Sequence, residues 1–374
     1  MAMKMDRDFH MVAGEGETSY FKNSTLQRKA LLETKPVLEK AVRDIRTDDD
    51  VLQPSITVVD LGCSSGENTL LFVSNVIEAI CRHREKLHGN LVELQFFLKD
   101  LPGNDFNHVF QSLEKFKEAI AMKFMDETPP PFSIAGLPGS YYTKLFPRQS
   151  VHLFHSSFCL HWRSELDLTV NKEMYKNKAN IYIGKTTPPD VAKLYQEHFQ
   201  KDMLLFLKLR YEELVLGGQM VLTFLGKITE DVYCGDMSLV FGLLGQSLES
   251  LVEEGLIERE KLNSFNVPFY GPSIDEVKTV VKQSGLFDIN HIKLFQSNWD
   301  PYDDDSEGDG VSDSLQSGIN VSKCYRAAME PILASHFGES VLHRLFEQFA
   351  YNIMEHLESE KTKYSIIVVS LKKR

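Results

Sequence analysis

The chain has 374 residues, of which 43% are hydrophobic and 25% charged, and this ordinary globular composition excludes a disordered or low-complexity protein. Its 41 Lys and Arg against 53 Asp and Glu give a net charge of −12, which repels a phosphate backbone, so we expect no nucleic acid partner. No long uncharged apolar run is present, and we expect no membrane partner. The five scattered cysteines favour reduced thiols and a cytoplasmic location.

Short runs rich in Val, Ile and Phe alternate with helical patterns, which is typical of an α/β sheet covered on both faces. The expected strands are residues 56–60, 94–100, 151–156, 219–225, 291–296 and 364–371. An amphipathic helix is expected from Asn68 to about Arg84, between the first two strands. Residues 229–270 and 315–360 carry helical apolar spacing and are expected to form an α-helical addition to the sheet.

An acidic segment, DPYDDDSEGDGVSDS, occupies residues 300–314 and is almost without apolar side chains. We expect it to form a mobile surface loop. Asp303, Asp304 and Asp305 cluster within it, so a calcium site is an alternative. The spacing lacks the alternating ligands and the closing Glu of an EF-hand, which favours the solvated loop.

The stretch ITVVDLGCSSGEN carries the most chemical information. A buried strand ends at Asp60, a loop with Gly62 and Gly66 follows, and a helix begins with free N-terminal amides, as in a nucleotide-type site. The glycine spacing does not fit G-x-G-x-x-G, so a dinucleotide site is not expected. The second strand also ends in an acid, Asp100, at a position suited to ribose hydroxyls. Each acid alone could be a turn former or helix cap, but the pair favours a nucleoside cofactor without phosphates, with a sulfonium and an amino acid tail.

Six stretches, in order and spacing, carry a resemblance to the plant SABATH family of carboxyl methyltransferases: HMVAGEGETSYFKNSTLQRK, DLGCSSGEN, LKDLPGNDFN, GLPGSYYTKLFP, HSSFCLHW and FNVPFYGPS. The resemblance runs from about His10 to the C-terminus. Within the family, KLRYEELVLGGQMVLTFLG and FQSNWDPYDD are most similar to grass enzymes that methylate anthranilate, with salicylate and benzoate methyltransferases as near relatives. It implies a class I methyltransferase fold, a Rossmann-like doubly wound sheet with an α-helical cap over the acceptor site, and S-adenosyl-L-methionine as cofactor.

The resemblance also implies a division of the chain. Residues 1–228 would form the cofactor-binding α/β core with an N-terminal lid segment, with 273–299 returning to the core and 362–374 supplying its final strand. Residues 229–272 and 315–361 would form the two parts of the cap, on either side of the acidic loop. Members of the family are usually homodimers, so a homodimer is implied as well.

Site residues follow from the same resemblance. It places the cofactor among Tyr20, Ser24, Asp60, Cys63, Asn68, Asp100, Leu101, Ser140 and Tyr141. It places the acceptor carboxylate near Gln27 and Trp162, with Phe158, His161, Phe241, Tyr325 and Ala328 shaping the pocket. Without the family, Trp162 and His161 would more often be core residues.

Some family members bind magnesium away from the methyl-transfer chemistry, and the matching positions are Asn180, Asn263, Phe265 through its carbonyl, and Asn266. Asn263 stands where relatives carry Asp, and loss of the carboxylate weakens a site for a hard cation. Structural asparagines in turns are the alternative interpretation.

The expected reaction makes the methyl ester of a small aromatic acid, with anthranilate first and salicylate or benzoate next. No catalytic acid or base is expected, because a carboxylic acid with a pKa around 4 is already ionised at neutral pH. Jasmonate or indole-3-acetate is the alternative acceptor.

Three other classes of function are alternatives to this reaction. Val12 and Phe158 remove polar groups near the acceptor, so a catalytically silent ligand-binding relative is the second hypothesis. A nicotinamide dehydrogenase agrees with the predicted sheet but not with the glycine spacing. A hydrolase based on the segment His155 to Cys159 lacks a nucleophile elbow.

Overall fold

The computed structural model describes residues 4–5, 7–45, 55–83, 92–124, 128–164, 169–170, 173–174, 177, 180–303, 311 and 313–374. Within these ranges, seven strands form one sheet in the order β3-β2-β1-β4-β7-β9-β8. They are β1 (Ser55–Leu61), β2 (Glu93–Asp100), β3 (Phe132–Pro138), β4 (Val151–Ser157), β7 (Leu214–Leu225), β8 (Phe287–Asn298) and β9 (Lys363–Lys373). Two short strands, β5 (Thr169–Val170) and β6 (Glu173–Met174), pair separately.

The sheet is parallel except at β9, which runs antiparallel to both β7 and β8. The interior strand β1 is buried from its second residue onward, as expected for a parallel strand covered on both faces. The chain crosses from β1 to β2 on one side and later to β4 on the other, so the carboxyl ends of β1, β2 and β4 meet at one edge. This arrangement confirms the predicted doubly wound sheet and puts a ligand crevice at the switch point.

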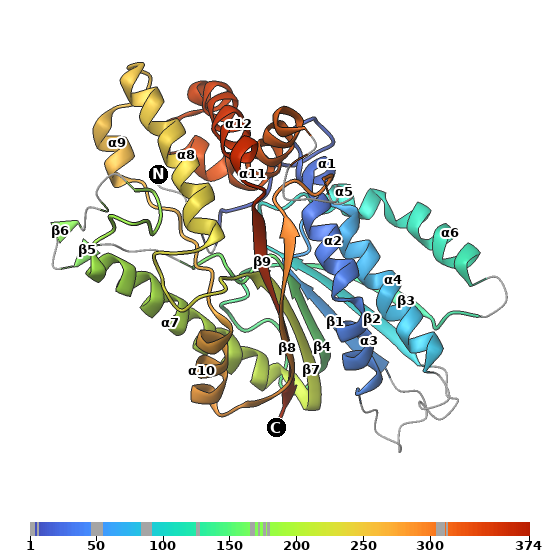
Figure 1. Ribbon diagram of the computed structural model, residues 1–374. Helices are drawn as coiled ribbons and strands as arrows, with labels where there is room; N and C mark the ends of the chain where they lie inside the picture. The colour runs from blue at the N-terminus through green and yellow to red at the C-terminus, as the bar shows by residue number, and fades with distance from the viewer. Residues whose placement is uncertain are drawn as a thin grey trace.

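Helices cover both faces of the sheet (Figure 1). One face carries α2 (Thr25–Glu33), α3 (Lys35–Arg43), α4 (Glu67–Arg82) and α6 (Leu113–Lys123). The other carries α7 (Pro189–Glu213) and α10 (Ile274–Ser284). The short helices α1 (Tyr20–Asn23) and α5 (Phe106–Gln111) lie near the carboxyl ends of the strands. None of the helices in the described ranges combines the length and hydropathy that a membrane span requires.

A helical cap lies over the edge of the sheet at which the parallel strands end (Figure 1). It consists of α8 (Asp236–Glu253), α9 (Arg259–Ser264), α11 (Ser314–Phe337), the 3-10 turn η2 (Glu339–Val341) and α12 (Leu342–Ser359). Helix α12 packs against both α8 and α11 through a row of buried Leu and Phe side chains. The cap therefore forms one side of the crevice at the carboxyl ends of the strands.

The start of the acidic segment differs from the expected solvated loop. Asp300 and Asp303 are buried, and the Asp300 carboxylate accepts hydrogen bonds from Ser317 Oγ at 2.7 Å and Asn320 Nδ2 at 3.1 Å. Asp303 pairs with Lys361 Nζ at 3.2 Å. The prediction of a mobile surface loop over 300–314 is thus wrong for its first residues, because Asp300 ties the segment to α11 and Asp303 ties it to the residues after α12. Residues 304–310 and 312 lie outside the described residues, and they include Asp304 and Asp305 of the alternative calcium site.

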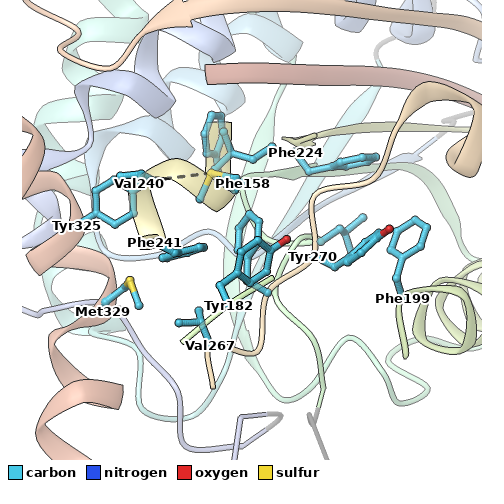
Figure 2. Packing of buried hydrophobic residues seen from close by; sticks show 14 of the residues in the cluster. Phe158, Tyr182, Phe199, Phe224, Val240, Phe241, Val267, Tyr270, Tyr325 and Met329 are labelled. Carbon is cyan, nitrogen blue, oxygen red and sulfur yellow. Dashed lines mark hydrogen bonds between the residues drawn. The ribbon is translucent and has the colours of Figure 1, made fainter. Parts of the chain in front are cut away.

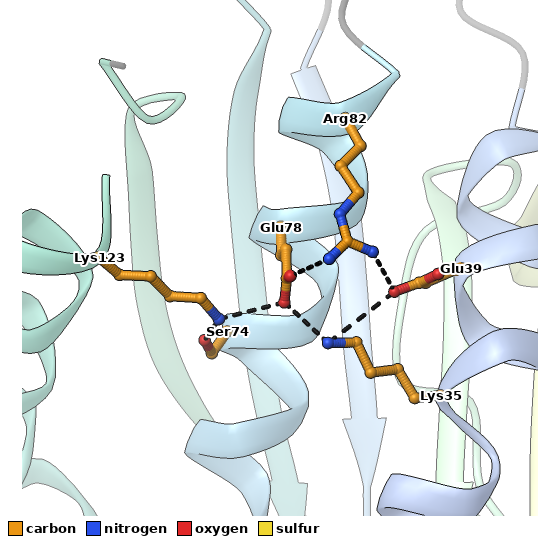
Figure 3. Close-up of polar contacts among 6 residues, drawn as sticks. All are labelled: Lys35, Glu39, Ser74, Glu78, Arg82 and Lys123. Atoms are coloured by element: carbon orange, nitrogen blue, oxygen red, sulfur yellow. Dashed lines mark hydrogen bonds and ion pairs between the residues drawn. The ribbon is translucent and has the colours of Figure 1, made fainter. Parts of the chain in front are cut away.

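An ion-pair network joins three helices on one face of the sheet (Figure 3). Glu78 of α4 accepts from Lys35 of α3 at 2.9 Å and from Lys123 of α6 at 3.1 Å, and it also pairs with Arg82. Arg82 continues the network to Glu39 at 2.8 Å. Partial burial alone raises the pKa of Glu78, but the hydrogen bonds from the two lysines outweigh it, and the net shift of the pKa is downward.

We expect Glu78→Gln to lower the free energy of unfolding by about 1 kcal/mol at neutral pH, a modest value because solvent screens the network. Since the pKa of Glu78 is lower in the folded state, the wild-type advantage is present above the ordinary pKa of Glu and is lost as the pH falls through the lowered pKa. Urea unfolding at neutral and acidic pH measures this. Glu197→Gln, which removes an exposed pair with Lys193, is the control; an equal loss in both variants would contradict the network's role.

Candidate functional site

Two adjoining cavities lie where the parallel strands end, beneath the cap. The strand-end cavity, of about 660 Å³, is lined by residues at and after the carboxyl ends of β1, β2 and β4 and by part of the N-terminal segment. The aromatic cavity, of about 550 Å³, is lined by α1, α2, α8, α11 and the segment after β4. Four residues line both cavities: Met11, Tyr20, Phe158 and Trp162. A ligand in one cavity would therefore meet a ligand in the other at this shared wall.

Asp100, the last residue of β2, faces the strand-end cavity. Its Oδ2 accepts from the backbone N–H of Ser64 at 2.7 Å and its Oδ1 from that of Leu101 at 2.7 Å. Burial raises the pKa of Asp100, and the charge of Lys99 and the two amide donors offset part of that effect. Each oxygen keeps a free acceptor position, so the carboxylate can still bind two hydroxyls.

The loop after β1 folds back over the end of β2. The backbone N–H groups of Gly62 and Cys63 both donate to the carbonyl of Lys99, at 2.7 and 3.0 Å. Gly62 has a φ of +83°, and a Cβ there would lie 1.9 Å from Cys159 Sγ. Only glycine fits this position, which explains the glycine after the strand in physical terms.

A buried ion pair fixes the loop after β3, which presents Ser140 and Tyr141 to the strand-end cavity. Arg210 of α7 donates to the carbonyls of Tyr141 at 2.8 Å and Thr143 at 2.9 Å. Its partner Glu213, at 2.8 Å, accepts from the backbone N–H groups of residues 145 and 146. Both charged side chains are fully buried, so the loop is held from behind by groups that do not reach the cavity.

The expected cofactor residues fall into two groups. Those that line the strand-end cavity are Tyr20, Asp100, Leu101, Ser140 and Tyr141. Those that line neither cavity are Ser24, Asp60, Cys63 and Asn68. In the second group, the Asn68 amide donates to Ser24 Oγ at 3.1 Å, so these two side chains bind each other and join α2 to the start of α4.

Asp60 has partners within the fold. Its Oδ1 lies 2.7 Å from His155 Nδ1, and its Oδ2 accepts from Thr69 Oγ1 at 2.7 Å. The His155 ring in turn stacks on Phe72, with ring centroids 4.1 Å apart. The two acids that end successive strands thus differ: Asp100 faces a cavity, whereas Asp60 joins β1, β4 and α4.

All the expected acceptor residues line the aromatic cavity: Gln27, Phe158, His161, Trp162, Phe241, Tyr325 and Ala328. Figure 2 shows Phe241 between Tyr325 and Tyr182, and the ring centroids are 6.0 and 5.1 Å apart. No described residue that lines this cavity is Lys, Arg, Asp or Glu. The cavity is therefore an aromatic slot without a formal charge.

Trp162 is fixed in the shared wall by rings on two sides. Phe9 contacts it edge-on with centroids 4.8 Å apart, and Phe269 does so at 5.7 Å. Next to it, His161 Nδ1 accepts from the backbone N–H of Leu225 at 3.3 Å. Burial, assisted by the charge of Arg163, lowers the pKa of His161 to about 3. His161 is therefore a neutral side chain of fixed orientation, and neither a cation nor an effective base.

Gln27 brings an unpaired polar group to the aromatic cavity. Its Oε1 is buried and has no hydrogen-bond partner among the described residues. A side-chain amide can turn to present either its oxygen or its two N–H donors. A buried amide with a free polar atom at a cavity wall calls for a partner on the ligand.

Phe158, in the shared wall, has a backbone φ of +58°, which a bulky residue rarely adopts. Its N–H donates to the carbonyl of Thr223 at 2.8 Å, which holds the turn in place. Such strain of about 1 to 3 kcal/mol often occurs at ligand sites. No pattern in the sequence indicated it.

Several lining residues were missed by the sequence analysis. They include Met11, Leu225, Met237, Phe269, Cys324 and Tyr364 in the aromatic cavity and Phe9, His10 and Arg163 in the strand-end cavity. An apolar wall residue follows the same helix or strand periodicity as a core residue, so no signal separates the two.

The positions matched to a magnesium site do not form a good site for a hard cation. Asn180 donates its amide to the Asn177 carbonyl at 2.8 Å, and Asn266 Oδ1 already accepts from Asn177 at 3.2 Å. Neither Asn263 nor the carbonyl of Phe265 supplies a carboxylate. Within the described ranges, no cluster of three His, Cys, Asp or Glu could hold a metal ion. These hydrogen bonds favour the alternative of structural asparagines, while the magnesium site itself stays a prediction.

The alternative hydrolase site at residues 155–159 has no nucleophile paired with a general base. His155 is bound to Asp60, and Ser156 Oγ donates to the carbonyl of Leu61 at 3.0 Å. Burial raises the pKa of the Cys159 thiol far above neutral pH, so it is no thiolate nucleophile.

The sheet order with a single antiparallel strand, together with a crevice at its switch point, defines a class I methyltransferase fold. A model of the SAM-dependent carboxyl methyltransferase family matches residues 6–374. The chain belongs to this family, the SABATH family, whose members use S-adenosyl-L-methionine to methylate carboxyl groups of small acids. Family, fold, enzyme class and cofactor are thus confirmed, while the homodimer and the cytoplasmic location stay predictions.

Individual relatives are similar over the whole chain. Anthranilate O-methyltransferase 1 of Zea mays is 53% identical, over 100% of this chain and 99% of its own length. Inactive anthranilate O-methyltransferase 1 of Zea mays is also 53% identical, with the same coverage. Among solved structures, a loganic acid methyltransferase with SAH is 31% identical, with a TM-score of 0.82 over 97% of this chain and 98% of that one.

Proposed function

We propose that this enzyme makes the methyl ester of a small aromatic acid, with anthranilate as the first candidate and salicylate and benzoate next. The observation that carries the proposal is the pair of adjoining cavities, one with a strand-end carboxylate and one aromatic and uncharged, which share the wall at Phe158 and Trp162. A cofactor in the first and a flat acid in the second would meet there. Maize anthranilate O-methyltransferase 1, at 53% identity, supports anthranilate, and a maize benzoate O-methyltransferase, at 50% identity, supports benzoate as the next candidate.

The residues of the strand-end cavity fit S-adenosyl-L-methionine. Asp100 would hold the ribose hydroxyls, and Leu101, Ser140 and Tyr141 would surround the nucleoside. When bound, the cofactor supplies a methyl group on a sulfonium, from which a neutral thioether leaves. The strand-end carboxylate suits the ribose hydroxyls of this cofactor, which carries no phosphate.

The protein needs no base for this chemistry. A small carboxylic acid is ionised at neutral pH and its oxygen is a ready nucleophile. This agrees with His161, which burial keeps neutral and weakly basic. The remaining task is to hold the oxygen in line and exclude water, and proximity of this kind can contribute about 7 to 11 kcal/mol.

Neutral donors suit the carboxylate better than a cation would. The Trp162 indole N–H at the shared wall and the Gln27 amide in the aromatic cavity would bind the oxygens. A Lys or Arg would form stronger charge-assisted bonds and reduce the nucleophilicity of the carboxylate. The absence of either residue from the described lining of the aromatic cavity supports this arrangement.

The proposal is tested by transfer of a labelled methyl group to a panel of acids: anthranilate, salicylate, benzoate, nicotinate, jasmonate and indole-3-acetate. Products are identified by mass spectrometry, and kcat/KM is compared. We expect the methyl ester of a benzenoid acid, anthranilate foremost, to form with the highest kcat/KM. Preferred transfer to jasmonate or indole-3-acetate would keep the reaction and contradict the aromatic acceptor.

A catalytically silent ligand-binding protein is the second candidate. It is favoured by one observation: the inactive maize relative is as similar to this chain as the active one. Calorimetry distinguishes the two proposals, because the silent protein would bind S-adenosylhomocysteine and an acid but form no ester across the panel.

Phe241 is expected to set the acceptor ranking. It forms a wall of the aromatic cavity from α8 and contacts Phe269 with ring centroids 5.4 Å apart. Phe241→Leu opens the slot and should shift the kcat/KM ratio of anthranilate to jasmonate about 10-fold toward jasmonate, within the 1 to 3 kcal/mol of a hydrophobic pocket. Phe346→Leu, a buried change in α12 away from both cavities, is the control. An unchanged ranking in the Phe241 variant would remove this residue from the specificity wall.

A further inference from the structure

Lys99 is a fully buried cation beside the cofactor crevice. It lies on β2 immediately before Asp100 and its side chain has no exposed surface. Its Nζ has no hydrogen-bond partner among the described residues. Burial of an ammonium group without such partners is costly, so its presence calls for a compensating role.

The Lys99 ammonium lies over an aromatic ring of the cavity wall. Its Nζ is 4.7 Å from the ring centroid of Tyr141, which lines the strand-end cavity, whereas Lys99 itself does not. Two other contacts fix Tyr141: its hydroxyl donates to the Cys159 carbonyl at 3.2 Å, and Arg210 donates to its carbonyl at 2.8 Å. The ring and the backbone of Tyr141 are thus held by Lys99 and Arg210, which do not line the cavity, and its hydroxyl is held by Cys159, which does.

We propose that Lys99 is a positioning residue of the cofactor site, whose ammonium holds the Tyr141 ring in the orientation that binds S-adenosyl-L-methionine. The proposal rests on the proposed placement of the cofactor in the strand-end cavity. Lys99 contacts neither cofactor nor acid and acts through the ring, as a desolvated cation–π contact. Loss of the charge should weaken cofactor binding about 5- to 30-fold.

If Lys99 has this role, cofactor affinity should depend on pH through the charge of Lys99. Burial lowers the pKa of Lys99 to about 8, and the charge of Asp100 opposes this shift. The charged and titratable groups facing it are Asp100 on its own strand, Cys63 after β1, Tyr141 after β3, Cys159 after β4 and Arg210 on α7. Burial raises the pKa of Cys63, Cys159 and Tyr141 and so keeps them neutral, and an arginine stays charged. Lys99 is therefore the group in this set that loses its charge near pH 8.

The test measures the affinity for S-adenosylhomocysteine by calorimetry at about pH 7 and about pH 9, on either side of that pKa. It compares the wild type with Lys99→Met, Lys99→Arg and the control Lys373→Met. Lys99→Met removes the charge and should bind about 5- to 30-fold more weakly than wild type at the lower pH. Lys99→Arg keeps a charge at both pH values, so its affinity should exceed that of wild type at the higher pH. The amino group of the ligand titrates alike with every protein, so the ratios between proteins report Lys99.

Lys373→Met is the matched control. Lys373 is also buried and lies over a tyrosine ring, with Nζ 4.4 Å from the centroid of Tyr211, but it is remote from both cavities. We expect this variant to bind S-adenosylhomocysteine as wild type does. Lys99→Met should also keep or raise the Tm, because it removes a buried charge without a hydrogen-bond partner, whereas a purely structural role would lower Tm and affinity together.

Either of two results would overturn the proposal. One is a Lys99→Met protein that binds within about twofold of wild type, well inside the effect expected of a lost cation–π contact. The other is an equal change in affinity for S-adenosylhomocysteine between the two pH values in wild type and Lys99→Arg. This second result contradicts the proposal even if the Lys99→Met protein does not fold. A wild-type protein that binds no S-adenosylhomocysteine would instead contradict the placement of the cofactor itself.

Discussion

Trp162→Phe is expected to lower kcat/KM for the acid about 100-fold, while affinity for S-adenosylhomocysteine stays within about twofold. The phenyl ring keeps the packing against Phe9 and Phe269, whose centroids lie 4.8 and 5.7 Å from that of Trp162. The change removes the indole N–H, a pre-oriented donor to the carboxylate in a cavity whose described lining has no charged side chain. Steady-state kinetics with each substrate varied, together with calorimetry, measures the two effects separately.

The control for this prediction is Phe269→Leu. It removes a ring from the same cavity wall and from contact with Trp162, but no hydrogen-bond donor. We expect a change in KM for the acid smaller than about 10-fold, as for other hydrophobic pocket contacts. If Trp162→Phe retains wild-type kcat/KM, or loses cofactor affinity in the same proportion as activity, the indole is not the carboxylate donor.

Asp100→Asn should raise the Kd of S-adenosylhomocysteine about 10- to 100-fold, as expected for loss of hydrogen bonds to a charged group worth about 1.5 to 3 kcal/mol. The amide has one acceptor oxygen, and its N–H₂ would face an amide donor, either Ser64 N–H or Leu101 N–H. The change would weaken both the hydrogen bonds to the ribose and the hydrogen bond that holds the loop after β1. Calorimetry measures the Kd, and KM for the acid at saturating cofactor should stay near wild type.

The pH dependence of binding gives a second readout of Asp100. Because burial raises the pKa of this carboxyl, the wild-type protein should lose cofactor affinity as the pH falls toward the raised pKa. Asp100→Asn should show a smaller pH dependence over the same range.

Asp60→Asn is the matched control, since Asp60 also lies at the carboxyl end of a strand but binds His155 and Thr69. This variant should have a lower free energy of unfolding than the wild-type protein, and its affinity for S-adenosylhomocysteine should fall less than that of Asp100→Asn. An equal loss of affinity in both variants would contradict the division of roles between the two acids.

Most of the sheet could be predicted because β1, β2 and β4 are short runs rich in Val, Ile, Leu and Phe. Strand β3 was missed because FSIAGLP is an edge strand of alternating burial with a glycine and a proline near its end. The burial of Asp300 was missed because its partners Ser317 and Asn320 lie 17 and 20 residues later in the chain. Composition alone cannot show such a non-local pairing.

The site shows the same limit. Asp60 and Asp100 have the same strand-end pattern, and only the fold reveals that His155, 95 residues after Asp60, binds the first acid. Seven residues that line the aromatic cavity could be named in advance because the motifs that carry the family resemblance are specific in residue type and order, and their acceptor role stays a prediction. The strained backbone of Phe158 and the buried Lys99 leave no mark in the sequence, because a lysine beside a strand-end acid is ordinarily solvated.

The most direct test of the central claim is a crystal structure of the protein with S-adenosylhomocysteine and anthranilate. The account predicts the ribose on Asp100 in the strand-end cavity and the anthranilate carboxylate on Gln27 and Trp162 in the aromatic cavity, with the thioether sulfur and a carboxylate oxygen facing each other across the shared wall. Density for the acid outside the aromatic cavity, or for the nucleoside away from Asp100, would contradict it.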